Sequence, residues 1–126
     1  MINIFKTKVF SRWSDKEGLT DIALCNAINE VEQGQVEASL GVYLFKKRVA
    51  RYGQGKRGSY RTIIAFKKED RAFFLFGFDK GSKNNISEKE AKALKKLSRY
   101  FVGCTNKELE SAVENGALIK VECEDE

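Results

Sequence analysis

The sequence predicts an α+β protein in which an antiparallel sheet packs against N-terminal and C-terminal helices. Three runs in the middle of the chain have the composition of strands, at 42–50, 59–66 and 71–78. Helical patterns flank them, over 20–34 and again after residue 87. Because helices and strands occupy separate parts of the chain, this order favours α+β over an alternating βαβ arrangement.

The N-terminal part is expected to start with a strand in "NIFKTKVF" that runs into a turn or short helix around Phe10 to Trp13. Thr20 is placed to cap the helix that follows. Apolar residues recur there at i, i+3, i+4 and i+7, which predicts one buried stripe, and Gly34 is positioned to end the helix.

In the middle of the chain, "SYRTIIAF" and "RAFFLFGF" are joined by the short polar link "KKED", which is typical of a hairpin. The run 72–78 is apolar on both faces, as expected of a central strand covered on two sides. The run 42–50 is apolar at first and basic toward its end.

The last third of the chain is predicted to be helical. Ser87 and Glu90 have the spacing of a capping box for a helix that stops at Gly103, and Thr105 and Glu108 repeat that spacing for a second helix. The segment "ALIKVE" predicts a final strand. With no internal repeat, linker-like segment or proline, residues 1–126 are expected to form a single domain.

Histidine is absent, which removes the commonest general base and metal ligand. Catalysis would then use Lys, Arg, Tyr or carboxylates, and neither a metal nor another cofactor is expected. Cys25, Cys104 and Cys123 are odd in number and form no C-x-x-C pair, which predicts reduced thiols in a cytoplasm. The sequence also lacks a signal-peptide core and an apolar run of about 20 residues, so no membrane partner is expected.

Positive charge is concentrated in the middle of the chain, where residues 41–83 hold twelve basic and three acidic residues. Tyrosines are interleaved with these cations, and aromatic rings beside cations suit base stacking next to phosphate contacts. The charge therefore points to a polyanionic partner. Residues 46–66 contain no acid and seven basic residues: Lys46, Lys47, Arg48, Arg51, Lys56, Arg57 and Arg61.

Two other interpretations of this basic run compete with a binding surface. The charges from Lys46 to Arg51 would protect an exposed edge strand from pairing with other chains, although solubilising surfaces usually mix both signs. The segment "GQGKRG" matches the dinucleotide-binding pattern G-x-G-x-x-G, but that motif opens a helix and here a strand follows. A glycine-rich hairpin loop that carries Lys56 and Arg57 toward a phosphate backbone is favoured instead.

The segments "IFKTKVFSRW", "KKRVARYGQGKRGSYRTIIAF" and "DRAFFLFGFDKGSKNNIS" closely resemble, in order and spacing, the RelE/HigB-like toxins of bacterial type II toxin–antitoxin modules. The resemblance covers nearly the whole chain. It implies a small RelE-like domain of the RelE/ParE superfamily with a curved antiparallel sheet. It further implies a cytoplasmic, monomeric toxin that cleaves translated mRNA at the ribosome and so inhibits translation. A cognate antitoxin of helix-turn-helix type, encoded next to the toxin, would neutralise it.

The resemblance also implies site residues for a metal-independent endoribonuclease. Tyr60 and Arg61 match a tyrosine–arginine pair whose arginine contacts the scissile phosphate in the better-studied toxins. Basic residues before the glycine-rich loop and after the last sheet strand match their remaining cations. The expected catalytic set is Arg61, Arg48, Arg51, Lys80 and Lys83, and the expected RNA-binding set is Lys46, Lys47, Lys56, Arg57, Tyr60 and Tyr52.

Two departures from the toxins' pattern put the reaction in question. Gly81 stands where those toxins place a catalytic arginine, and Ser87 stands near their C-terminal tyrosine. Without histidine, proton transfer would fall to Lys47, Lys80 or Lys83, since crowding among like charges disfavours the charged form of a lysine. Arginine suits the phosphate itself, because its planar fork stays charged and matches two oxygens.

Two other functions compete with RNA cleavage. The ParE-type toxins share the fold but poison DNA gyrase by binding it, and the departures at Gly81 and Ser87 are compatible with that class. A non-toxic nucleic-acid-binding regulator would bind with steep salt dependence and leave no cleaved product.

Overall fold

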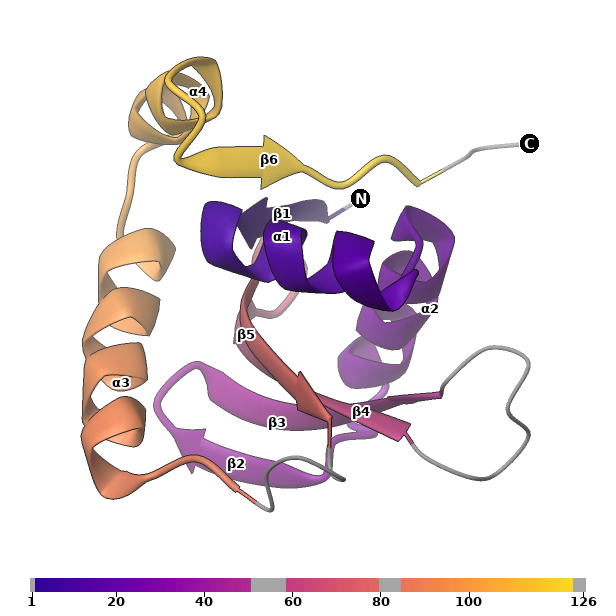
Figure 1. The fold of residues 1–126 in the computed structure, drawn as a ribbon. Helices are drawn as coiled ribbons and strands as arrows, with labels where there is room; N and C mark the ends of the chain where they lie inside the picture. The colour runs from indigo at the N-terminus through magenta and orange to yellow at the C-terminus, as the bar shows by residue number, and fades with distance from the viewer. Residues whose placement is uncertain (1, 51–58, 80–84, 124–126) are drawn as a thin grey trace.

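The computed structural model describes residues 2–50, 59–79 and 85–123, which form a six-stranded sheet with helices on both faces (Figure 1). The predicted α+β class is confirmed. The strands are β1 (Asn3–Thr7), β2 (Ala38–Gly41), β3 (Leu44–Ala50), β4 (Ser59–Lys67), β5 (Arg71–Asp79) and β6 (Leu118–Lys120). The helices are α1 (Lys8–Glu17), α2 (Asp21–Glu32), α3 (Glu88–Val102) and α4 (Asn106–Glu114).

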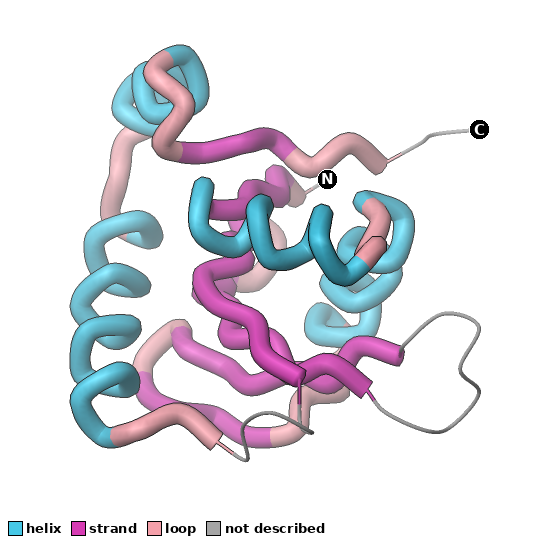
Figure 2. Tube along the Cα trace, viewed as in Figure 1, coloured by secondary structure: helices cyan, strands magenta, loops and turns pink. Residues whose placement is uncertain are grey.

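The strands lie in the order β2-β3-β4-β5-β1-β6 (Figure 2). The predicted hairpin is confirmed, because β4 pairs with β5 in antiparallel register, and β3 pairs with β4 in the same way. The sheet is mostly antiparallel, as expected, and one pair departs from this pattern, since β1 runs parallel to β5. A parallel neighbour requires a long crossover. Here the connection from β1 to β5 runs through α1, α2 and the strands β2, β3 and β4.

The strand predicted at 42–50 begins two residues later than expected, and an additional short strand pairs with its first residues. Val42 and Tyr43 form a turn, with Tyr43 at a φ of 63°, and β3 starts at Leu44. The preceding short strand β2 was not predicted, and it pairs antiparallel with β3. Among the described residues, β2 pairs with β3 only from Leu44 to Lys46, while β4 pairs with β3 along its whole length. The interpretation of the basic residues as edge-strand charge is therefore wrong for Lys46 but stays open for Lys47 and Arg48.

The helix boundaries largely follow the predicted caps. Thr20, Ser87 and Thr105 each accept a hydrogen bond from a first-turn backbone N–H, and the last two form full capping boxes. The first helix is longer than the short turn expected around Phe10. Thr7, the last residue of β1, caps it directly, and Gly18 ends it with a φ of 75°.

The core lies on both faces of the sheet, with α1 and α2 covering one face and α3 and α4 the other. The central strand β5 sends Phe74 toward α1 and Phe73 toward α3, and both rings are fully buried. This confirms the prediction of a strand covered on two sides. Within the described parts of the chain, no helix combines the length and apolarity that crossing a membrane demands.

Gly77 is required by the packing of α1 on the sheet. A methyl group added at Gly77 would collide with the indole ring of Trp13. We expect Gly77→Ala to lower the free energy of unfolding by roughly 1–3 kcal/mol, the usual cost of overpacking. Urea unfolding measures this loss. The double variant Gly77→Ala/Trp13→Leu should recover part of it, and unchanged stability in the single variant would contradict the contact.

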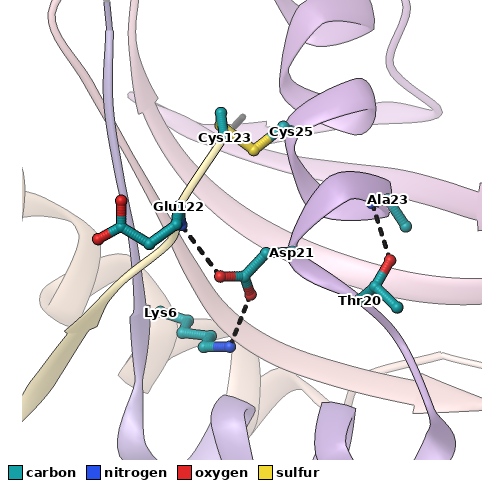
Figure 3. Close-up of a disulfide and its surroundings, with 7 residues drawn as sticks. All are labelled: Lys6, Thr20, Asp21, Ala23, Cys25, Glu122 and Cys123. Atoms are coloured by element: carbon teal, nitrogen blue, oxygen red, sulfur yellow. Dashed lines mark hydrogen bonds and ion pairs between the residues drawn. A yellow bond between two sulfur atoms is a disulfide. The ribbon is translucent and has the colours of Figure 1, made fainter. Parts of the chain in front are cut away.

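The C-terminal segment is fastened to α2 by a disulfide between Cys25 and Cys123, whose Cα atoms lie 5.9 Å apart (Figure 3). The prediction of three reduced thiols is therefore wrong for this pair. Asp21 reinforces the connection by accepting hydrogen bonds from Lys6 Nζ and from the backbone N–H of Glu122, both at 3.0 Å. Sequence spacing hid the pairing because the two cysteines lie 98 residues apart. The inference from cysteine count to a reducing compartment consequently does not hold.

Candidate nucleic-acid interface

The basic residues of β3 and β4 divide between the two faces of the sheet, because successive side chains on a strand point in opposite directions. Arg48 pairs directly across the strands with Arg61, so both side chains lie on the face that α3 covers. Lys46 shares this face, and its Nζ donates to Asn85 Oδ1 at 3.5 Å. Lys47 and Tyr60 point to the face covered by α1 and α2.

Arg48 and Arg61 meet at the hydroxyl of Ser59. Arg61 donates from a terminal guanidinium nitrogen to Ser59 Oγ at 2.8 Å, and Arg48 donates from Nε to the same oxygen at 3.3 Å. Arg61 Nε also forms an ion pair with Glu37 Oε1 at 2.9 Å. We call Glu37, Arg48, Ser59 and Arg61 the arginine cluster. It joins β3, β4 and the residue just before β2.

The electrostatics of the arginine cluster are unusual for a sheet. Like charges directly opposite each other on neighbouring strands destabilise the pairing, and Arg61 is only 7% exposed. A buried charge needs a partner, and Glu37 provides it. The basic run of residues 46–66 therefore contains no acidic residue, but the fold brings Glu37 next to it. Glu37 and Ser59 together hold the two like-charged side chains next to each other.

Lys47 has a different environment from the arginine cluster. It is 7% exposed, its Nζ lies 2.6 Å from Glu30 Oε1 on α2, and it donates to the carbonyl of Gln35 at 2.9 Å. These contacts tie the end of α2 to β3. Lys47 therefore points to the opposite face of the sheet from Arg61.

Tyr60 is a core residue. Its ring packs edge-on against Trp13 with centroids 5.2 Å apart, and its hydroxyl lies 3.2 Å from both the carbonyl and the Oε1 of Glu17. Only 4% of the residue is exposed. Base stacking requires an open ring face, so the expectation that Tyr60 stacks on RNA does not fit this position.

Several expected site residues lie outside the described residues. These are Arg51, Tyr52, Lys56, Arg57, Lys80 and Lys83, together with the G-x-G-x-x-G segment and Gly81. Ser87, near the position of the toxins' C-terminal tyrosine, is described. Its hydroxyl accepts the backbone N–H of Glu90 as the N-cap of α3.

Two members of the arginine cluster were missed from the sequence. Glu37 lies before a short strand that was itself not predicted, so no pattern connected it with Arg61. Ser59 offered a better signal, since it directly precedes the tyrosine–arginine pair in the same predicted strand. Its role depends on the cross-strand register of β3 and β4, which only the fold supplies.

The fold and the family comparison define the class of this protein as a toxin of a toxin–antitoxin system, because a family model of such toxins matches residues 2–121. The chain belongs to the RelE family, since the matching model is described as RelE toxin of the RelE / RelB toxin-antitoxin system. A search of curated proteins finds no match to the chain. Membership of the family implies a cognate antitoxin as its partner.

Proposed function

We propose that this toxin is an mRNA endoribonuclease that acts at the ribosome and inhibits translation, with the arginine cluster as its phosphate site. The observation that carries the proposal is the Arg48–Arg61 pair, two guanidinium groups held together across β3 and β4 around Ser59. Planar guanidinium groups match phosphate oxygens and remain charged at every relevant pH. The resemblance to toxins whose equivalent of Arg61 contacts the scissile phosphate supports the same assignment.

The proposed reaction is attack by the 2′-hydroxyl of the RNA on the adjacent phosphate, which breaks the bond to the 5′-oxygen and leaves a cyclic phosphate. Arg48 and Arg61 stabilise the negative charge that develops on the phosphorane. Arg48 is the exposed member and meets the backbone first. Arg61 lies deeper, where a lower dielectric strengthens its interaction with an anion.

The cleavage reaction also needs side chains that take a proton from the 2′-hydroxyl and give one to the 5′-oxygen. Lys47 is unsuited to the role, because its Nζ is engaged by Glu30 and Gln35 on the other face. The proposal therefore keeps Lys80 and Lys83 as candidates, with Arg51 as a further phosphate ligand and Lys46, Lys56 and Arg57 along the RNA backbone. We further propose a helix-turn-helix antitoxin encoded beside the toxin.

Inhibition of DNA gyrase by a non-nucleolytic toxin is the second candidate function. The observation in its favour is Ser87, which caps α3 and offers no phenolic group where the nucleolytic toxins have a tyrosine. In that case the arginine cluster would bind a protein carboxylate or DNA instead of a scissile RNA phosphate.

Induction of the toxin in a bacterial host separates the two candidates. We expect incorporation of labelled amino acids to stop within minutes while DNA synthesis continues, and new 5′ ends to appear in mRNA. Co-expression of a neighbouring antitoxin gene should relieve the arrest. An early DNA-damage response with intact mRNA would instead support gyrase inhibition.

A further inference from the structure

The hydroxyl of Ser59 has an arrangement that goes beyond support for the two arginines. A serine hydroxyl can accept two hydrogen bonds and donate one. Here the oxygen accepts from Arg61 at 2.8 Å and from Arg48 at 3.3 Å, so both accepting positions are occupied. Only the O–H proton is left for a further partner.

The proton of Ser59 needs an acceptor that tolerates two adjacent cations. No acceptor for it lies among residues 2–50, 59–79 and 85–123 in the hydrogen bonds that the structure forms. The two guanidinium groups around this oxygen outnumber the one carboxylate of the cluster, Glu37, so the net local charge is positive and favours an anionic acceptor over a neutral one. Ser59 is half-buried, so a ligand can reach it.

We infer that Ser59 is a phosphate-binding residue, which donates its O–H to a non-bridging oxygen of the RNA backbone while Arg48 and Arg61 hold its oxygen. This inference rests on the proposed function, since it names a third ligand of the same phosphate. The hydroxyl adds an uncharged hydrogen-bond donor between the two guanidinium groups. It orients the phosphate without adding charge to a pair that already repels itself.

The test measures binding of a single-stranded, fully 2′-O-methylated RNA oligonucleotide, which cannot be cleaved, at several salt concentrations. Each phosphate contact made by a cation contributes about 0.7 to the slope of log affinity against log salt for a single strand. We expect Ser59→Ala to weaken binding about 10-fold with an unchanged slope, since it removes a hydrogen bond to a charged group but no charge. Arg48→Gln should weaken binding and also reduce the slope.

The controls separate this inference from the proposed function. Ser59→Thr keeps a hydroxyl and should bind like wild type, as should Ser111→Ala on the exposed face of α4. Unchanged affinity in Ser59→Ala, or a slope reduced as in Arg48→Gln, would overturn the donor role of Ser59 while leaving the arginines as RNA ligands. Unchanged affinity in Arg48→Gln and Arg61→Gln as well would overturn the proposed function itself.

Discussion

Replacing Arg61 by Gln should reduce mRNA cleavage roughly 100- to 1,000-fold, as expected when a preorganised donor to a developing negative charge is removed. Arg61 is the member of the arginine cluster with both an ion pair to Glu37 and a short bond to Ser59, which fix its orientation. Arg61→Lys should lose nearly as much, because lysine keeps the charge but lacks the planar fork. Cleavage rates per folded molecule, with growth arrest on induction, measure the effect.

Because Arg61 is buried, its replacement will also cost stability, and the controls must account for this. Arg71 has similar burial, at 8% exposed, and bonds to Asp70 and Asn106 at the start of α4. Arg71→Gln should therefore lose stability yet cleave like wild type per folded molecule. Arg99→Gln, an exposed change on α3, should alter neither. Wild-type cleavage by Arg61→Gln would remove Arg61 from the site.

Reduction of the Cys25–Cys123 disulfide is expected to have the largest effect on stability. The bond closes a loop over most of the chain, since the two cysteines are 98 positions apart in the sequence. Constraining the unfolded chain over such a loop stabilises the native state by about 4–5 kcal/mol as an upper value. Urea unfolding with and without a reductant, together with the Cys25→Ser/Cys123→Ser double variant, measures this contribution.

Counting the reactive thiols by alkylation provides the control for the unfolding experiment. Burial raises the pKa of the Cys104 thiol, which lowers its thiolate fraction near pH 8 and slows its alkylation in the folded protein. Unfolded, unreduced protein should therefore expose one thiol, and reduced protein three. Reductant should leave the double variant unchanged. Three thiols without reduction, or equal stability in both conditions, would contradict the disulfide.

Much of the fold follows from local patterns in the sequence. Capping residues and apolar periodicity located α2, α3 and α4, and the hairpin of β4 and β5 followed from two apolar runs and a short polar link. The parallel placement of β1 beside β5 and the short strand β2 could not be predicted in the same way. Both depend on tertiary pairing, and neither has a strong local signal.

The candidate site was predictable in residue type but not in arrangement. Sequence reasoning grouped Arg48, Arg61, Lys47 and Tyr60 by proximity along the chain. The alternation of side chains places the last two on the opposite face of the sheet. The acids that pair with these cations come from Glu30 and Glu37, which precede the basic run and are brought to it only by the fold.

The central claim is that this RelE-family toxin cleaves RNA at a phosphate held by Arg48 and Arg61. The most direct measurement is the mapping of mRNA ends after incubation of the purified protein with translating ribosomes. We predict new 5′-hydroxyl ends and 2′,3′-cyclic phosphates with wild type, and neither with Arg61→Gln nor on a message with a 2′-deoxy nucleotide at the cut. Intact mRNA in an incubation where the wild-type protein still stops translation would contradict the claim.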